Sequence, residues 1–177
     1  MIYIFTATKS EAQAIVEHCK LKKNKNYTFS FFQSKTINLL VTGIGKELVQ
    51  RSLENFFQTF QPTQQDRFIN IGITAAPKEF AIGTLHKIQT ILFENKAITL
   101  DENGITLRTL LLPQNTPLNT FADMEAFFIA QKLQNYSLEI YKVVSDHFDP
   151  SSVTKEKTKQ LIKKALKEIP SLGRDIE

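Results

Sequence analysis

Strand-like and helix-like stretches alternate along the first 150 residues, and this alternation constrains the fold more than any other feature of the sequence. Short runs rich in β-branched and aromatic side chains predict strands at residues 2–6 and 67–71. Apolar residues at helical spacing predict a helix at residues 10–20 and another that follows Gly45 and ends before Pro62. This order is typical of an α/β domain in which helices cover both faces of a mixed sheet. We therefore expect a three-layer α/β fold.

The same patterns predict the remaining elements. Further strands are expected at residues 27–33, 37–42, 85–93 and 139–145, and further helices at residues 120–136 and 154–168. Asn103-Gly104 is a strong turn signal, so residues 97–100 and 105–107 are expected to pair as a hairpin.

The helix at residues 120–136 has a sequence typical of a capped N-terminus. The side chain of Thr120 would accept hydrogen bonds from the first amides of the helix, and the side chain of Asp123 would reach back to the amide of Thr120. No internal repeat, low-complexity tract or linker interrupts the pattern, and residues 1–177 are predicted to form one domain.

Composition excludes several classes of protein. With 42% hydrophobic residues and a net charge of +4, the chain is not expected to be disordered. Its single cysteine, Cys19, rules out a disulfide framework and a cysteine-based metal site. No run approaches the roughly 18–20 apolar residues of a membrane span, and residues 1–5 lack the basic start of a signal peptide. We therefore expect a cytoplasmic protein.

The basic excess belongs to one segment. Residues 154–168 hold six lysines and two glutamates, and the charges of the rest of the chain cancel. We interpret this segment as a helix with a solvated outer face, with no nucleic-acid or membrane partner. The alternative is a binding module for anionic membrane or nucleic acid, although the apolar stripe of the same helix suits docking on the protein's own sheet equally well. The stripe consists of Leu161, Ile162, Ala165, Leu166 and Ile169.

Candidate functional residues follow several of the predicted strands. Glu11 comes after the first strand, Gly43 after a second, Gly72 after a third, and Asp146 directly after the last. In open α/β sheets, ligands bind beyond the carboxyl ends of the strands. If these strands are parallel neighbours, the four residues converge on one pocket.

Glu125 is a further candidate. At helical spacing it projects toward the same side as Phe121, Phe128 and Ile129, where a carboxylate is costly to bury without a partner. It is therefore either a partly exposed glutamate of the first helical turn or an acceptor for ligand hydroxyls. Together with Glu11 and Asp146, it would give three carboxylates around one cleft, which could divide acid, base and binding roles.

Four segments occur in an order that resembles the nucleoside phosphorylase/nucleosidase family, above all the methylthioadenosine/S-adenosylhomocysteine nucleosidases and futalosine hydrolases. The segments are Thr42-Gly43-Ile44-Gly45-Lys46, Ile69-Asn70-Ile71-Gly72, Asp123-Met124-Glu125-Ala126 and Val144-Ser145-Asp146. The resemblance covers residues 1–149.

The resemblance implies hydrolysis of the N-glycosidic bond of a purine nucleoside, without metal or cofactor. The aspartate matching Asp146 would protonate the base, and the glutamate matching Glu11 would orient or activate water. Met124 and Glu125 would bind the ribose, with Gly43 and Gly72 also at the substrate. The resemblance further implies a homodimer.

Three features of the sequence bear on alternatives. The loop after the first strand has Lys9 but no arginine, which counts against phosphate as co-substrate and so against phosphorolysis. After Gly72 the chain continues Ile73-Thr74-Ala75-Ala76-Pro77, where the family has a glycine-rich stretch. Only 35 residues separate Ile88 from Met124, so the base-binding region would be shortened. A divergent family member that binds a nucleoside with altered or lost catalysis is therefore an alternative.

Overall fold

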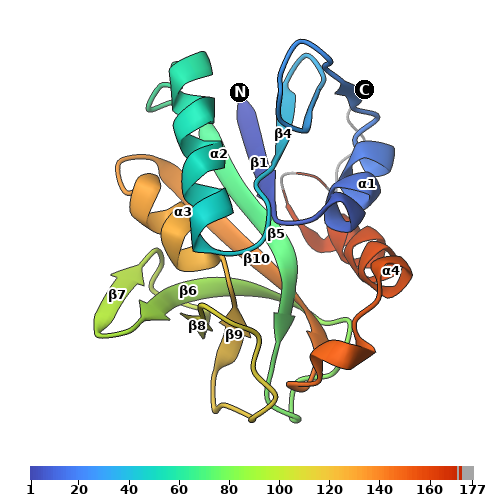
Figure 1. The fold of residues 1–177 in the computed structure, drawn as a ribbon, viewed down its shortest axis with the longest axis vertical. Coiled ribbons are helices and arrows are strands. Elements are labelled where there is room, and N and C mark those ends of the chain that lie inside the picture. Colours follow the sequence, from blue (N-terminus) through green and yellow to red (C-terminus); the bar gives the residue numbers. More distant parts are fainter. Residues whose placement is uncertain (171, 173–177) are drawn as a thin grey trace.

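The computed structural model describes residues 1–170 and 172 as a three-layer α/β arrangement (Figure 1). Helices α1 (Lys9–His18) and α4 (Lys155–Ala165) cover one face of the sheet. Helices α2 (Lys46–Thr59) and α3 (Ala126–Lys132) cover the other. The expected fold class is confirmed. No helix among the described residues is long and apolar enough to cross a membrane.

Among the described residues, ten strands form one mixed sheet. They are β1 (Ile2–Thr6), β2 (Lys22–Lys23), β3 (Phe31–Gln33), β4 (Ile37–Val41), β5 (Arg67–Ala75), β6 (Leu85–Phe93), β7 (Lys96–Thr99), β8 (Ile105–Thr109), β9 (Phe121–Asp123) and β10 (Ser137–Asp146). The centre of the sheet consists of β4, β1, β5 and β10, which are parallel neighbours in that order. The carboxyl ends of these four strands therefore lie at one edge, which meets the condition that the sequence left open for a common pocket.

The other strands turn part of the sheet into a closed ring. β10 pairs with β6, β6 with β8, β8 with β9, and β9 returns to β5, which itself pairs with β10. The ring brings β9 to the same edge as the ends of β5 and β10, since Ala122 pairs with Ala75 and Ala75 with Asp146.

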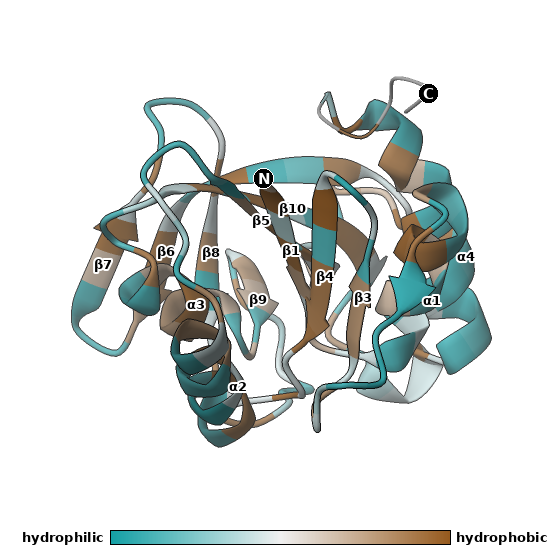
Figure 2. Ribbon diagram, turned by 90° about the horizontal axis from the view of Figure 1, so that it is seen from above, coloured by the Kyte–Doolittle hydropathy of each residue, from teal (hydrophilic) through white to brown (hydrophobic). Residues whose placement is uncertain are grey.

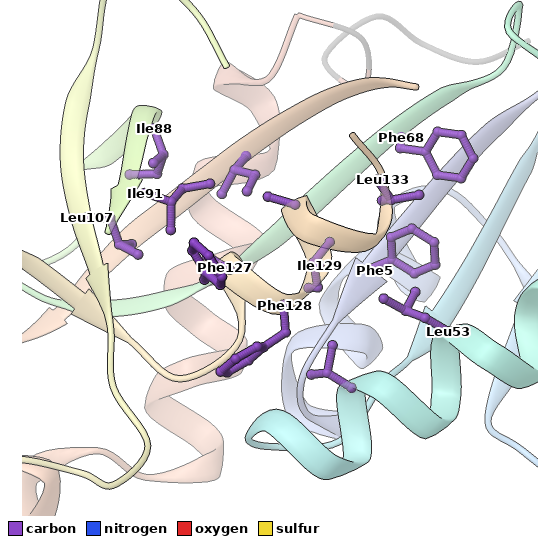
Figure 3. Close-up of a cluster of buried hydrophobic side chains, with 14 of the residues drawn as sticks. Phe5, Leu53, Phe68, Ile88, Ile91, Leu107, Phe127, Phe128, Ile129 and Leu133 are labelled. Atoms are coloured by element: carbon purple, nitrogen blue, oxygen red, sulfur yellow. The ribbon is translucent and has the colours of Figure 1, made fainter. Parts of the chain in front are cut away.

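Two separate hydrophobic cores hold the helices on the sheet. The core under α2 and α3 is rich in phenylalanine, and Figure 3 shows Phe127, Phe128 and Ile129 of α3 together with Leu53 of α2. The core under α1 and α4 is aliphatic and includes the buried Cys19. Figure 2 shows the apolar residues concentrated on the inner strands, with polar outer faces on α2 and α4. Apolar burial of this kind stabilises a fold by roughly 25 cal/mol per Å².

The predicted helix at residues 120–136 is wrong in its first third. Phe121–Asp123 forms β9, and the helix begins only at Ala126. Thr120 therefore caps no helix. The local sequence favours a helix, but backbone pairing of β9 with β5 and β8 overrides that preference.

The predicted hairpin around Asn103-Gly104 is also wrong. β7 and β8 both pair with β6 and not with each other. The hairpin turn lies instead at Glu94-Asn95, between β6 and β7. β7 pairs with Thr90–Phe93 and β8 with Ile88–Leu92, so the two strands lie on opposite edges of the same part of β6.

Other strand boundaries also differ from the prediction. β5 continues through Gly72 to Ala75, so Gly72 lies within a strand and not at its end. The strand predicted at residues 27–33 is confined to Phe31–Gln33.

The apolar stripe of α4 and the segment that follows it belong to the protein's own core. Ile162, Ala165, Leu166 and Ile169 are buried against the sheet and α1. This stripe is therefore not available to a membrane, which removes the apolar contact that the alternative of a membrane-binding module requires.

Candidate active site

A cavity of about 300 Å³ lies at the carboxyl ends of β1, β5 and β10. Its lining includes all three of the predicted carboxylates and the predicted methionine: Glu11, Met124, Glu125 and Asp146. Each of these residues lies at or just after the carboxyl end of a strand, and the sheet brings them together as expected. The rest of the wall is mainly apolar, which lowers the local dielectric and strengthens charge interactions.

Glu11 lies at the start of α1, where it forms a capping box with Thr8. One oxygen, Oε2, accepts from the Thr8 amide at 2.7 Å and from the Thr8 hydroxyl at 3.0 Å. The other, Oε1, accepts from the amide of Ile73 on β5 at 3.1 Å. These bonds fix the carboxylate, and only 2% of the residue is exposed.

Asp146 is the last residue of β10 and is 4% exposed. Its Oδ1 accepts from the hydroxyl of Ser145, and its Oδ2 accepts from the amide of Asp149 at 2.9 Å. Ser145 also donates to the carbonyl of Thr74. The carboxyl group is thus held in one orientation by its neighbours on the chain. His147, next to it, binds the carbonyl of Ala76 instead and does not contact Asp146 through any hydrogen bond of the described residues.

Glu125 and Met124 occupy the bend between β9 and α3. The Glu125 carboxylate accepts from the amide of Gly45 at 3.0 Å, which links the bend to the start of α2. Glu125 is 8% exposed. Its burial excludes the alternative of a partly exposed glutamate, and it lies in the bend that precedes α3 and not in the expected helical turn.

The two predicted glycines have different surroundings. Gly43 has a φ of +88°, and a Cβ there would lie 2.7 Å from Cβ of Leu48, so only glycine fits this turn. It lines a groove next to the cavity. Gly72 lies in the middle of β5 and does not line the cavity. A Cβ there would lie 3.1 Å from Glu11 Oε1 and 3.2 Å from Lys142 Nζ, so its role is to leave room for these two groups.

The sequence interpretation missed a buried ion pair beneath the cavity. Lys142 of β10 is 2% exposed, and its Nζ lies 2.8 Å from Oδ2 of Asp123. Asp123 also accepts from the hydroxyl of Thr109 at 2.8 Å and from the amide of Ala126 at 3.0 Å. A lysine four residues before Asp146 on a buried strand is the signal that would have revealed the pair, because lysine is almost never fully buried unpaired.

Lys142 is surrounded by negative charge. Burial alone would lower the pKa of Lys142, but the charges of Asp123, Glu125 and Glu11 raise it above its ordinary value. Burial raises the pKa of Glu11, and the charge of Lys142 and hydrogen bonds from Thr8 and Ile73 offset part of that rise. Burial, with the nearby charge of Asp123, raises the pKa of Glu125 to about 8, against the opposing effect of Lys142.

The raised pKa of Glu125 predicts a pH-dependent stability. The unfolded state has an ordinary glutamate with a pKa near ~4.3, so the folded state binds the proton more tightly. The stabilising contribution is complete below that value and is lost as pH rises through about 8. We expect Glu125→Gln to raise the melting temperature relative to the natural protein, by roughly 5 °C at pH 9 and by less at pH 5.

Thermal melts of both proteins between pH 5 and pH 9 measure this difference. Glu47→Gln, at an exposed glutamate in the first turn of α2, is the matched control and should show no such trend. A difference between Glu125→Gln and the natural protein that stays constant across the range would contradict the assignment.

The region between Ile88 and Met124 also contributes to the cavity. After β8 the chain passes along it, and Leu110, Leu112, Pro113 and Gln114 line its wall. The family resemblance implies that this region contacts the purine base. Among residues 1–170 and 172, no group of three or more histidine, cysteine, aspartate or glutamate side chains is arranged to hold a metal ion.

Three solved nucleosidases have the same fold as this chain. An MTAN from Chlamydia trachomatis matches with a TM-score of 0.77 and 19% identity, over 96% of this chain and 97% of that chain. The Helicobacter pylori 5′-methylthioadenosine/S-adenosylhomocysteine nucleosidase, solved with butyl-thio-DADMe-Immucillin-A, matches with a TM-score of 0.77 and 13% identity over 97% of each chain.

A third structure is the S. pneumoniae nucleosidase of the same name, solved with a transition-state inhibitor. It matches with a TM-score of 0.75 and 14% identity, over 92% of this chain and 94% of that chain. No protein-family model and no curated protein sequence matches the chain. The chain therefore has the fold of the methylthioadenosine/S-adenosylhomocysteine nucleosidases over nearly its whole length.

Proposed function

We propose that the protein hydrolyses the N-glycosidic bond of a purine nucleoside that is modified at its 5′ position, such as methylthioadenosine. The observation that carries the proposal is the convergence of Glu11, Glu125 and Asp146 with Met124 on one cavity, in a chain with the fold of nucleosidases solved with the inhibitors MT-ImmA and butyl-thio-DADMe-Immucillin-A. A volume of about 300 Å³ suits a molecule of nucleoside size.

Asp146 is the proposed general acid. The carboxyl group protonates the purine as the bond to the sugar breaks, and the base leaves as a neutral molecule. The segment from Leu110 to Gln114 supplies the wall beside the base. Hydrogen bonds from Ser145 and the amide of Asp149 keep the carboxyl group in place during this step.

Glu11 is the proposed partner of the attacking water. A carboxylate offers about four acceptor positions, and bonds from Thr8 and Ile73 fill three of them. One position on Oε1 therefore stays open for water. The positive charge of Lys142 favours the ionised form of Glu11, which is the form that accepts a proton from water.

Glu125 and Met124 are the proposed ribose contacts. Glu125 would accept hydrogen bonds from the sugar hydroxyls, and Met124 would pack on the ring. The sugar becomes oxocarbenium-like in the transition state, so the carboxylates around it also stabilise its positive charge.

Water is the proposed nucleophile in preference to phosphate. Among the described residues, the cavity lining holds four carboxylates and no arginine or lysine. A phosphate dianion would be repelled there, since its sites in proteins present arginine forks or clustered amides.

We also propose that residues 1–177 act as one domain and work as a homodimer in the cytoplasm. Ile44 and Leu112 line the cavity and are 53% and 75% exposed. Exposed apolar groups beside a site are typical of a protein–protein interface.

A panel of purine nucleosides, scored for release of free base with and without phosphate, tests the proposal. We expect base release that does not depend on phosphate and that is faster for 5′-modified nucleosides. Stabilisation against heat by nucleosides without any release of base would instead support a nucleoside-binding protein that has lost catalysis.

A further inference from the structure

The charge of the chain is divided unevenly between two parts of the molecule. Residues 9–35 hold six lysines and two glutamates, and residues 154–168 hold the same numbers. These two segments together carry a net charge of +8, so the other residues carry −4. The first segment does not stand out in the sequence because acidic residues elsewhere in the chain balance its charge.

The fold places the two lysine-rich segments side by side. Glu17 of α1 lies 2.6 Å from Nζ of Lys159 and 3.7 Å from Nζ of Lys163, both of α4. Figures 1 and 2 both show α1 beside α4, and Figure 2 shows β3 at the same end of the molecule. β2 lies beyond β3 as the last strand of the sheet. Most of the positive charge therefore gathers on one face, formed by α1, β2, β3 and α4, which we call the basic face.

A groove of about 260 Å³ crosses the basic face between α1 and the strands β2 and β3. Its lining combines two lysines with one aromatic and two polar side chains: Lys9, Gln13, Lys23, Ser30 and Phe32. The side chain of Phe32 is partly exposed. Lysines beside an accessible aromatic ring are the usual components of a site for single-stranded nucleic acid, in which the phosphates contact the cations and a base stacks on the ring.

The lysines continue from this groove across the face. Lys9 also lines the groove next to the active-site cavity, and Lys155 of α4 lines that groove too. Lys23, Lys9 and Lys155 therefore follow one another from β2 to α4. All three are exposed, and none forms an ion pair with any of residues 1–170 and 172.

The stability of the fold does not account for these positions. Lysines on an outermost strand prevent pairing with other sheets, which explains Lys22 and Lys23. Lys9 and Lys155, however, are the first residues of α1 and α4. A cation at the N-terminus of a helix is opposed by the helix dipole, so both lysines are placed against the preference of their own helices.

We infer that the basic face binds single-stranded nucleic acid, with phosphates along Lys23, Lys9 and Lys155 and a base against Phe32. The expectation of a face without a nucleic-acid partner considered residues 154–168 alone, and the lysines of residues 9–35 change it. An anionic membrane is a poorer partner, because none of the exposed large apolar side chains among the described residues belongs to either segment. The inference does not depend on the proposed nucleosidase function.

Fluorescence anisotropy of a labelled oligouridylate of about 16 nucleotides tests the inference. We expect saturable binding with a Kd on the order of 10⁻⁶ M at about 50 mM salt. Contact with about four phosphates predicts a slope of about −3 for the logarithm of affinity against the logarithm of salt concentration, so affinity should fall about 50-fold at about 200 mM salt. A duplex of the same length should bind more weakly, because its bases are stacked inside and do not reach Phe32.

Two triple variants with the same net charge assign the binding to the basic face. Lys9→Gln/Lys23→Gln/Lys155→Gln should lower the affinity about tenfold and reduce the steepness of the salt dependence by about 2. The matched control should keep the affinity within about twofold, because it removes three exposed lysines outside the two segments. These are Lys78, Lys96 and Lys132.

A single variant tests the contact with the base. Phe32→Leu should weaken binding at least about fivefold without changing the salt dependence, since stacking involves no phosphate. Phe29→Leu, on the same segment but outside the groove, is the control and should keep the affinity. If Phe32→Leu fails to fold, the triple variants, which change only exposed side chains, decide the question.

Several results would overturn the inference. These are the absence of saturable binding, tighter binding of the duplex, equal losses in the two triple variants, or an unchanged affinity of a folded Phe32→Leu variant. Binding to phosphatidylserine vesicles without binding to the oligonucleotide would also overturn it and would assign the face to a membrane. Base release from nucleosides is measured separately, so the inference and the proposed function can each fail without the other.

Discussion

Replacing Asp146 by asparagine is expected to lower kcat for base release by about 10²–10⁴-fold, which is the usual contribution of a general acid. Asparagine has the same shape as aspartate but no acidic proton to give to the purine. The base would then have to leave as an anion, and bond breaking would slow accordingly.

The same substitution should have a small effect on stability. Asparagine can still accept a hydrogen bond through its remaining oxygen, either from Ser145 or from the amide of Asp149. We expect a change in melting temperature of about 2–4 °C, the equivalent of one weakened hydrogen bond. Binding of a nucleoside to the variant, measured by calorimetry, should persist because the ribose contacts are unchanged.

Asp149→Asn is the matched control. Asp149 lies three residues further along the chain, is exposed and does not line the cavity. It should keep the activity of the natural protein. If Asp146→Asn releases base at a rate close to that of the natural protein, Asp146 is not the general acid.

Replacing Lys142 by methionine is expected to lower both stability and activity. Methionine is similar in length but carries no charge, so Asp123 would remain buried without a counterion beside Glu125 and Glu11. Breaking a buried ion pair in this way costs about 3–5 kcal/mol. For a chain of this length, the melting temperature should fall by about 10 °C.

The pH profile distinguishes an electrostatic role of Lys142 from a purely structural one. Without Lys142, the pKa of Glu11 rises further above its ordinary value, because the opposing charge is gone. Glu11 must be ionised to accept a proton from water, so the acidic limb of kcat/KM against pH should move to higher pH. A loss of stability with an unchanged pH profile would contradict this role.

Two further variants complete the comparison. Lys142→Met/Asp123→Asn removes both charges and should recover part of the lost stability without restoring the pH profile. Lys163→Met removes an exposed lysine of α4, whose side chain is 64% exposed, and should change neither property. Equal melting temperatures for Lys142→Met and Lys163→Met would show that the buried pair of Lys142 and Asp123 contributes nothing to the stability of the fold.

The sequence alone places the candidate carboxylates Glu11 and Asp146 at one cavity because their positions are local to strand ends. Glu11 and Asp146 follow strands whose composition is unambiguous, and the carboxyl ends of parallel strands meet at one edge of a sheet. The glycines of the turn before α2 are also visible in the sequence, since a turn with positive φ favours glycine at Gly43 and Gly45.

Sequence patterns fail in the region between Ile88 and Ala126, where pairing decides the structure. Phe121–Asp123 has helix-forming neighbours, yet it becomes a strand because β5 and β8 offer it backbone partners. The turn signal at Asn103-Gly104 joins two strands that pair with β6 on different edges. Such partners are distant in the chain, and periodicity over a short window carries no information about them.

The sequence by itself determined the three-layer fold and the three carboxylates of the candidate site. These features depend on the periodicity of apolar residues and on the position of polar residues relative to strand ends, and both are properties of short segments. Only the tertiary structure decided the closed ring of strands, the ion pair between Lys142 and Asp123, and the meeting of two lysine-rich segments on one face. The physical reason is that charge pairing and enclosure depend on distances between segments far apart in the chain, and these distances exist only once the sheet has formed.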